Sequence, residues 1–232
     1  TCTTGVGSGS VGARVAARLY SARVAIHRAT PATASTMRRL RCLPNVAPPM
    51  NPSTIYCTVV DKDRNVCSFI NSIAHSFGSA IVSNKTGILL QNRAGGFRIQ
   101  PGHPNCIAPG KRPLHTIIPG LATKNGRAVM PYGVMGGQYQ PVGQCHVLTN
   151  ILDYGCDVQE AIDMPRGLHY EGVYQLEDGV PAEVVEGLKK LGHKTTSVVS
   201  PLGGGQAIWI DWDKGTLTGG SDPRKDGCAL GY

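Results

Sequence analysis

The feature that most constrains the fold is a change in sequence character near residue 54. No Asp or Glu occurs before Asp61. The β-branched and apolar run TIYCTVV (54–60) is followed by the turn-like DKDRN (61–65) and by VCSFINSI (66–73), in which apolar and polar residues alternate. Two such runs on either side of a short turn predict a β-hairpin. The sequence therefore predicts a folded domain, residues 54–232, that begins with two antiparallel strands.

The preceding segment, residues 1–53, carries most of the net charge of +8. It holds seven Arg, no Lys and no acid, which leaves 16 basic and 15 acidic residues for the rest of the chain. A basic segment can bind nucleic acid, but RRLR (38–41) has no interleaved aromatic residues for base stacking, so no nucleic-acid partner is expected. We interpret residues 1–53 as a basic leader of uncertain structure, either solvated and disordered or non-native. It lacks the pattern of a signal peptide, and the localisation, cytoplasmic or periplasmic and secreted, stays open.

Several other classes of protein are not favoured. No apolar run approaches about 20 residues, so no membrane span is expected. GSGSVG (7–12) has the glycine spacing of a dinucleotide site, but no strand can precede it and no acid follows at about 20 residues. The eight Cys form no C-x-x-C pair, the seven His show no H-E-x-x-H spacing, and GHPNC (102–106) is interpreted as a loop. Neither a metal nor a cofactor is expected.

The rest of the domain is predicted to mix strands and helices. Residues 93–115 are rich in Gly and Pro and predict a long loop. Asp157 is expected to be the N-cap of a short helix. The expected strands are 127–135, 195–200 and 205–213, and the expected helices are 143–155, 157–166 and 180–193. Strands at both ends with helices between them favour a layered α+β or α/β fold.

Thr54 stands where the domain is predicted to begin. A Thr hydroxyl is a poor nucleophile unless a base lies beside it, and one solution makes the Thr the first residue of a chain, so that its own α-amine is the base. That requires cleavage of a precursor just before the Thr. Thr54 follows the Pro-rich APPMNPS (47–53). A Thr that simply begins a strand is commonplace, so the position alone does not identify Thr54 as a nucleophile.

From Thr54 to Tyr232 the sequence resembles the small subunit of the gamma-glutamyltransferase (gamma-glutamyltranspeptidase) family of N-terminal nucleophile hydrolases. Residues 1–53 show no such resemblance. The similar blocks occur in the family's order: TIYCTVVD (54–61), HSFGSAI (75–81), GILLQN (87–92), PGKRPL (109–114), GVMGGQ (133–138), DVQEAIDMPR (157–166) and SDPRKDGCALGY (221–232).

The resemblance implies an α+β fold, the four-layer αββα sandwich, and autoproteolysis between Ser53 and Thr54. Thr54 would then be the nucleophile, with its amine as base. Ser72 matches a family Thr whose hydroxyl contacts the nucleophile. Gly136 and Gly137 match a Gly-Gly pair whose N–H groups form the oxyanion hole, although a Gly-Gly pair is also common in turns.

The departures from the family concern the substrate. Gly96 takes the place of an Asp that holds the α-amine of the gamma-glutamyl group, and Ala74 takes the place of an Asn. His115 and Thr116 replace paired Ser residues that contact the α-carboxylate, and Arg93 replaces a Glu or Gln. A pocket that loses an acid and gains Arg93 suits an extra carboxylate better than an ammonium, unless Arg93 merely faces solvent. The expected substrate-binding residues are Asn92, Arg93, His115 and Thr116.

The resemblance therefore implies an amidohydrolase or acyltransferase that cleaves gamma-glutamyl or glutaryl-type amides through an acyl-enzyme on Thr54. Glutathione metabolism and cephalosporin acylase activity both occur in such a family. A small-molecule amide is the expected substrate, and water or an amine would resolve the ester. A large-subunit-like chain or segment is the expected partner, since in the family it supplies part of the fold and an Arg for the substrate carboxylate. The alternative is an inactive or fragmentary family member that acts as a scaffold.

Overall fold

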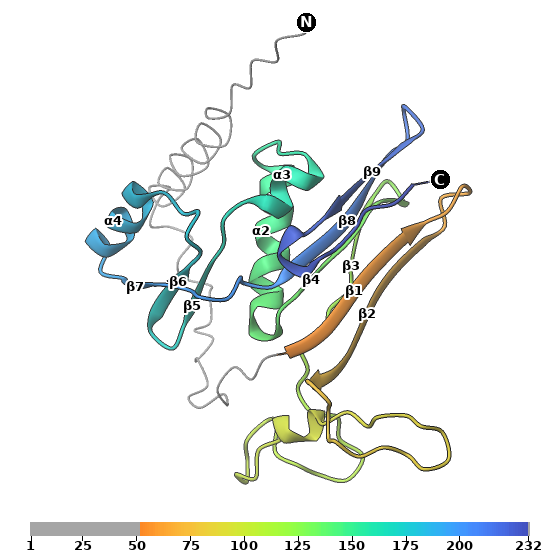
Figure 1. Ribbon diagram of the computed structural model, residues 1–232, viewed down its shortest axis with the longest axis vertical. Coiled ribbons are helices and arrows are strands. Elements are labelled where there is room, and N and C mark those ends of the chain that lie inside the picture. Colours follow the sequence, from red (N-terminus) through yellow and green to blue (C-terminus); the bar gives the residue numbers. More distant parts are fainter. Residues whose placement is uncertain (1–51, 232) are drawn as a thin grey trace, which may run out of the picture.

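The computed structural model describes residues 52–231, with side chains from Thr54 onward (Figure 1). The leader predicted for residues 1–53 lies outside the described residues, apart from the backbone of its last two. The elements are, in chain order, β1 (Pro52–Val60), β2 (Val66–His75), η2 (Arg93–Gly96), β3 (Gly120–Lys124), β4 (Arg127–Met135), η3 (Gly137–Tyr139), α2 (Gln140–Leu152), α3 (Val158–Asp163), β5 (Gly167–Tyr170), β6 (Val173–Leu176), α4 (Ala182–Lys190), β7 (Lys194–Ser197), β8 (Gly204–Asp211), β9 (Thr216–Ser221) and η4 (Pro223–Lys225). The described chain is α+β, as predicted.

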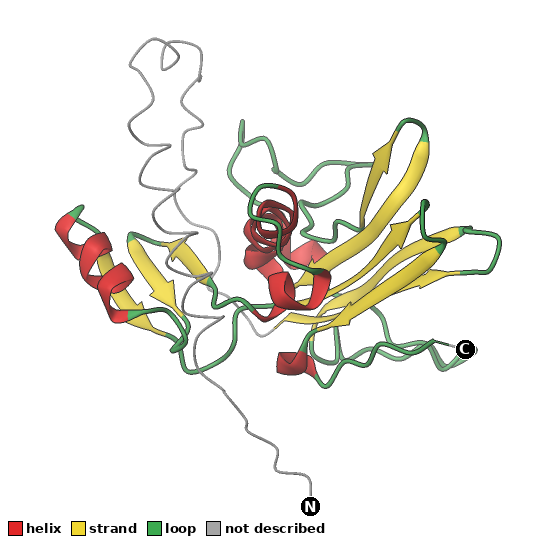
Figure 2. Cartoon of the chain, turned by 90° about the horizontal axis from the view of Figure 1, so that it is seen from above, coloured by secondary structure: helices red, strands yellow, loops and turns green. Residues whose placement is uncertain are grey.

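The strands form three sheets. β1 and β2 form a two-stranded sheet, β3-β4-β8-β9 form an antiparallel four-stranded sheet, and β5-β6-β7 form a small sheet in which β6 and β7 are parallel. The small sheet and α4 lie to one side of the other elements, as Figure 2 shows. No helix among the described residues is long and apolar enough to cross a membrane.

Strand β4 shows how the layers stack. Successive residues of a strand point to opposite faces of its sheet. A Cβ built on Gly133 would lie 2.5 Å from the ring of Tyr56 on β1. The side chain of Val134, the next residue, lies against Gly143 of α2. The four-stranded sheet therefore carries helices on one face and the β1–β2 hairpin on the other, which gives the order helix, sheet, sheet.

The hairpin predicted from the sequence is confirmed. β1 and β2 pair from Val60 and Val66 outward. Asp61 closes the turn, because its Oδ1 accepts the N–H groups of Asp63 at 2.9 Å and Asn65 at 2.8 Å. Hydrogen bonds from Asn65 lower the pKa of Asp61, so the turn favours the ionised carboxylate.

The helices α2 and α3 bury the core against the four-stranded sheet. Met130 of β4, Val147 of α2 and Ile162 of α3 are almost wholly buried in it. Asp157 is the N-cap of α3, as predicted, and forms a capping box: its carboxylate accepts the N–H of Glu160 at 2.8 Å, and Glu160 accepts the N–H of Asp157 at 3.0 Å.

The elements differ from the sequence prediction in several places. α2 begins at Gln140, three residues before the predicted start, with a proline in its first turn. α3 ends at Asp163, because Pro165 follows and Arg166 turns into the protein interior. Strands β3, β5, β6 and β9 were not predicted; β5 and β6 have only four residues each.

Candidate active site

Thr54 lies on the inner face of β1 and is only 8% exposed. It pairs across the hairpin with Ser72 of β2, and its Oγ1 donates a hydrogen bond to Ser72 Oγ at 3.0 Å. The same Ser72 oxygen accepts the N–H of Ala74 at 3.1 Å. The structure therefore brings together Thr54 and Ser72, the predicted nucleophile and the residue expected to contact it.

Tyr56 fixes the hairpin on the four-stranded sheet. Its ring, 3% exposed, occupies the space left by the missing side chain of Gly133. Its hydroxyl lies 2.8 Å from Ser68 Oγ, which donates to the carbonyl of Gly120 at 2.8 Å. Burial raises the pKa of Tyr56 to about 12, against the opposing effect of the Ser68 hydrogen bond. Tyr56 is thus a neutral phenol that sets the position of Thr54, two residues earlier on the same face.

Gly136 and Gly137 connect β4 to η3 and α2. Their φ angles are +134° and +58°, which favour glycine. A Cβ on Gly136 would lie 2.7 Å from the Cα of Gly203. The first N–H groups of a helical turn have no partner within it, and η3 runs directly into the 13-residue α2. Gly136 and Gly137 therefore lie at the start of a helical segment, where the helix dipole is positive. Their part in an oxyanion hole stays a prediction. Figure 1 shows β1 beginning at the end of the sheets where α2 follows β4.

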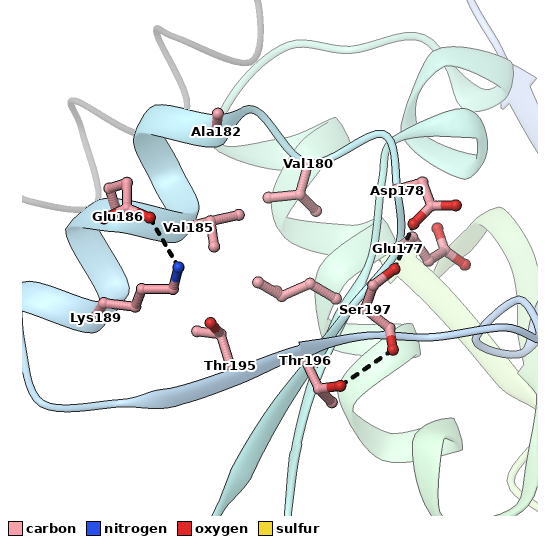
Figure 3. Close-up of a pocket in the computed structure, with 11 residues that line it drawn as sticks. Glu177, Asp178, Val180, Ala182, Val185, Glu186, Lys189, Thr195, Thr196 and Ser197 are labelled. Carbon is pink, nitrogen blue, oxygen red and sulfur yellow. Dashed lines mark hydrogen bonds and ion pairs between the residues drawn. The ribbon is translucent and has the colours of Figure 1, made fainter.

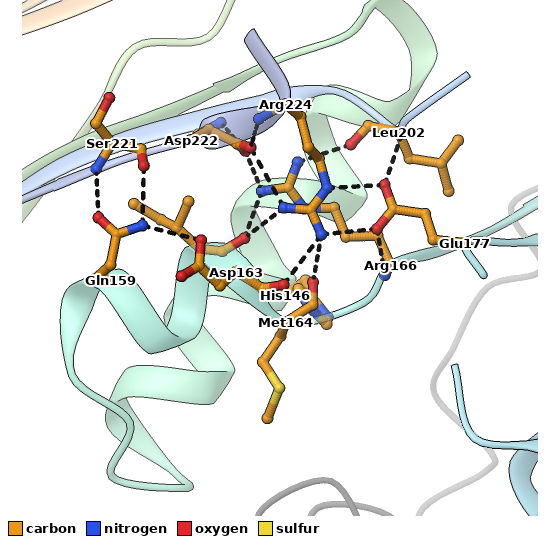
Figure 4. Close-up of polar contacts among 12 residues, drawn as sticks. His146, Gln159, Asp163, Met164, Arg166, Glu177, Leu202, Ser221, Asp222 and Arg224 are labelled. Carbon is orange, nitrogen blue, oxygen red and sulfur yellow. Dashed lines mark hydrogen bonds and ion pairs between the residues drawn. The ribbon is translucent and has the colours of Figure 1, made fainter. Parts of the chain in front are cut away.

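An ionic network lies next to this loop (Figure 4). The side chains of Arg166 and Asp222 are fully buried, and Nη2 of the first is 2.5 Å from Oδ2 of the second. Glu177 and Arg224 extend the network with an ion pair at 2.8 Å. Burial acts to lower the pKa of Arg224, but the hydrogen bond and charge of Glu177 outweigh burial and raise it. All four charges are therefore paired.

The network holds the segment that supports Gly136. Arg166 donates to the carbonyl of Leu202 at 2.8 Å, and Glu177 accepts the N–H of Leu202 at 2.9 Å. Gly203 follows directly and is the residue in closest approach to Gly136. These charged residues were not predicted as functional. The only signal was that Arg166 lies in the block DVQEAIDMPR (157–166) and that Asp222 and Arg224 lie in the block SDPRKDGCALGY (221–232). Glu177 lies in neither block.

Asn92 was predicted to bind substrate, but the structure occupies its side chain with the end of β2. Its Oδ1 accepts the N–H of His75 at 3.1 Å, and its Nδ2 lies 2.6 Å from Nδ1 of His75. Its own N–H donates to the carbonyl of Ile73 at 3.1 Å. Asn92 is therefore a structural clamp in this state, and a substrate contact by Asn92 stays a prediction.

Asn105, which was not predicted, joins the two segments that carry the other substrate candidates. Its Nδ2 donates to the carbonyl of Gly96 at 2.6 Å, and its Oδ1 accepts the N–H of Leu114 at 3.0 Å. From the sequence, GHPNC (102–106), which contains Asn105, was predicted only to be a loop. Its amide is what places residues 93–96 beside residues 114–116.

The remaining substrate candidates differ in exposure. Arg93 lies in η2 and is half-buried, and burial lowers its pKa. Thr116 is half-buried and His115 is exposed. Their contact with a substrate stays a prediction, but partial desolvation of Arg93 is the condition under which a guanidinium interacts strongly with a carboxylate.

A cavity of about 430 Å³ lies elsewhere, between α4 and β7 (Figure 3). It is lined by apolar side chains such as Val180 and Val185, and by the Glu186–Lys189 ion pair on the exposed face of α4. Thr54 does not line it. The cavity is therefore separate from the hydrogen-bonded hydroxyls of Thr54 and Ser72. Within residues 52–231, no three His, Cys, Asp or Glu side chains are grouped to hold a metal ion.

The family model described as Gamma-glutamyltranspeptidase matches residues 11–232. The match begins before Thr54, within residues 1–53, the segment interpreted from its composition as a basic leader.

Two curated proenzymes are similar to most of the chain. The glutathione hydrolase-like YwrD proenzyme of Bacillus subtilis is 40% identical over 199 residues, which are 82% of this chain and 38% of that protein. The oxamate amidohydrolase proenzyme of Klebsiella pneumoniae is 38% identical over 188 residues, 77% of this chain and 35% of that protein. The chain thus spans little more than a third of these relatives.

A solved structure agrees with the fold. The cephalosporin acylase from Bacillus halodurans superposes with a TM-score of 0.73 and 42% sequence identity, over 76% of this chain and 34% of that chain. The α+β fold of this chain is therefore shared with a solved enzyme structure.

Proposed function

Because the chain belongs to the gamma-glutamyltranspeptidase family, with its α+β fold of N-terminal nucleophile hydrolases, we propose that it is the nucleophile-bearing part of an amidohydrolase or acyltransferase. The observation that carries this proposal is the pair Thr54–Ser72, hydrogen-bonded at 3.0 Å across the β1–β2 hairpin, which packs on β4. Gly136 and Gly137 follow β4 and supply the backbone donors.

Maturation is a rearrangement at the Ser53–Thr54 bond. Thr54 Oγ1 attacks the carbonyl carbon of Ser53, the C–N bond breaks, and the departing nitrogen takes up the hydroxyl proton. An ester then joins Ser53 to Thr54 Oγ1. Water hydrolyses this ester and leaves a Ser53 carboxylate and a free Thr54 α-amine. That amine is the base which the Thr54 hydroxyl needs for turnover.

Turnover repeats the chemistry on a small amide. The α-amine takes the Thr54 hydroxyl proton as Oγ1 attacks the amide carbon, and the oxyanion forms opposite the N–H groups of Gly136 and Gly137. The C–N bond breaks, the leaving amine takes the proton, and an acyl ester remains on Thr54. Water, or an acceptor amine, then releases the acyl group.

The acyl group is proposed to lack an α-ammonium, as a glutaryl group does. Gly96 offers no carboxylate to such an ammonium, and the half-buried Arg93 lies three residues away. An unpaired ammonium near an arginine is penalised, whereas a carboxylate is favoured. Relatives named oxamate amidohydrolase and cephalosporin acylase support this choice. The relative named glutathione hydrolase-like supports the gamma-glutamyl alternative.

A second polypeptide layer is proposed to complete the enzyme. The outer face of the hairpin exposes Ile55, Val59 and Phe69, at 69, 53 and 51%. Apolar side chains gathered on one exposed face mark an interaction surface. Nearly two-thirds of the sequence of each relative lies outside its match to this chain, and a segment equivalent to that part is the proposed source of the covering layer.

The test is a comparison of the full-length precursor with its Thr54→Ala variant. The wild type should be cut before Thr54, as seen by intact mass, and should hydrolyse a glutaryl or gamma-glutamyl anilide. Thr54→Ala should do neither. A wild-type chain that stays whole and turns over neither anilide would favour the alternative, an inactive family member that acts as a scaffold.

A further inference from the structure

The regular pairing of β1 and β2 breaks at the proposed cleavage bond. Thr54 pairs with Ser72, but Pro52 pairs with His75, so Ile73 and Ala74 on β2 lie opposite Ser53 alone. Two residues opposite one define a β-bulge. Ala74 has a φ of +77°, which is uncommon for a residue with a Cβ. The chain thus holds a strained alanine across the hairpin from the bond to be broken.

The bulge connects to Thr54 through a single oxygen atom. Ala74 N–H donates to Ser72 Oγ at 3.1 Å, and Thr54 Oγ1 donates to the same oxygen at 3.0 Å. A hydroxyl oxygen has two lone pairs, and both are used here. The Thr54 proton is therefore held toward Ser72, and the lone pairs of Thr54 Oγ1 are directed away from it, free to attack a carbonyl carbon.

Asn92 holds the bulge in place from outside the hairpin. Its backbone N–H binds the carbonyl of Ile73, and its side-chain oxygen binds the N–H of His75, both at 3.1 Å. These two bonds flank Ala74 on either side. These bonds to Asn92 hold β2 where its hydrogen-bonded pairing with β1 is interrupted, and they fix the direction of the Ala74 N–H.

We propose that this bulge is a positioning device for the Thr54 hydroxyl, in which Ala74 and Asn92 act through Ser72. The inference rests on the proposed function and adds a role for Ala74 and Asn92 that is exerted through Ser72 and not by contact with the scissile bond. It predicts that the positive φ of Ala74 matters for both cleavage and acylation, because both use the same Thr54 oxygen.

The test is Ala74→Val in the full-length precursor, with Ala80→Val as the matched control. A β-branched side chain disfavours positive φ. Ala80 also has a positive φ, +59°, but it is exposed and its N–H binds the carbonyl of Phe77 in a loop. Ala74→Val should slow cleavage before Thr54 by about tenfold to a hundredfold, the effect of a misplaced reacting group. It should lower kcat of the mature enzyme more than it raises KM. Ala80→Val should cleave at the wild-type rate.

Two further variants separate positioning from general damage. Ala74→Gly accepts positive φ and keeps the N–H, so it should cleave at least tenfold faster than Ala74→Val. In a Ser72→Ala background, Ala74→Val should cause no further loss, because the connecting oxygen is gone. If Ala74→Val fails to fold, Asn92→Ser, which shortens the clamp but keeps its N–H, should show the same dependence on Ser72.

The inference is overturned if Ala74→Val cleaves at the wild-type rate, if Ala80→Val is equally slow, or if the loss persists undiminished without the Ser72 hydroxyl. In each of these cases the wild-type precursor is still cut and active, so the proposed function stands. A wild-type precursor that is never cut and never active overturns both.

Discussion

Asp222→Asn should strongly destabilise the domain, although it changes only one atom of the side chain. The carboxylate is fully buried, and its Oδ2 accepts from Arg166 at 2.5 Å and from the N–H of Gly205 at 2.7 Å. An amide in its place leaves the Arg166 guanidinium, also fully buried, without a counter-charge. The guanidinium keeps its hydrogen bonds to the carbonyls of Ile162 and Leu202, which are neutral acceptors.

The magnitude follows from burial. Removing one partner of a buried ion pair costs about 3–5 kcal/mol, because the other charge stays desolvated. At an m-value of about 2 kcal/mol per molar urea, the unfolding midpoint should fall by about 1.5–2.5 M. The network also holds Leu202 and Gly203 against Gly136, so the variant should lose turnover under conditions in which it is still folded.

The assay is urea unfolding followed by circular dichroism, with Asp63→Asn as the control. Asp63→Asn is the same chemical change in an exposed ion pair: the side chain of Asp63 is 64% exposed and that of its partner Lys62 is 87% exposed. Exposed pairs contribute about 0–1 kcal/mol, so the control midpoint should hardly move. Equal midpoints for Asp222→Asn and the wild type would refute the argument from burial.

Four more results are expected. Thr54→Ser should keep part of both cleavage and turnover, because the hydroxyl is retained. If Thr54→Ser were as inactive as Thr54→Ala, the hydroxyl alone would not account for the role of Thr54. Gly137→Val should lower kcat by about 10²–10³ with native circular dichroism, since a side chain at φ +58° displaces the oxyanion donor; unchanged kcat would make Gly137 a turn residue. Gly96→Asp should shift the ratio of the kcat/KM values for glutaryl and gamma-glutamyl anilide by about tenfold to a hundredfold toward gamma-glutamyl anilide. A Cβ built on Gly96 lies 3.4 Å from the nearest atom, so space for the new side chain is available. An unchanged ratio would mean that the amine is recognised elsewhere. Stability should fall by up to about 2–3 kcal/mol between pH 10 and 12, because the folded pKa of Tyr56 is raised above the unfolded value and its neutral form is favoured; Tyr56→Phe should flatten this loss in alkaline urea titrations.

The local parts of the fold could be predicted from the sequence. The two strand-like runs on either side of DKDRN predicted the hairpin, and Asp157 as an N-cap predicted a helix start, because these signals act between residues close in the chain. The pairing of Thr54 with Ser72 followed from the family resemblance, and the register of the hairpin agrees with it.

The long-range polar contacts could not be predicted in the same way. Arg166 and Asp222 are 56 residues apart, and only the folded chain makes their charges neighbours. Asn92 matched a family block, yet its amide is used on His75. Asn105 lay in a loop with no periodicity, although it joins Gly96 to Leu114. The sequence shows that such polar side chains are present, but the tertiary packing decides which partners they contact.

The most direct test of the central claim is a search for an acyl group on Thr54. The full-length precursor would be incubated with a glutaryl anilide, quenched in acid, digested and measured by mass spectrometry. The account predicts a peptide that begins at Thr54 and carries the glutaryl mass, absent after treatment with hydroxylamine. A chain that is uncut before Thr54, or a glutaryl group that is attached to another residue while the anilide is being hydrolysed, would contradict it.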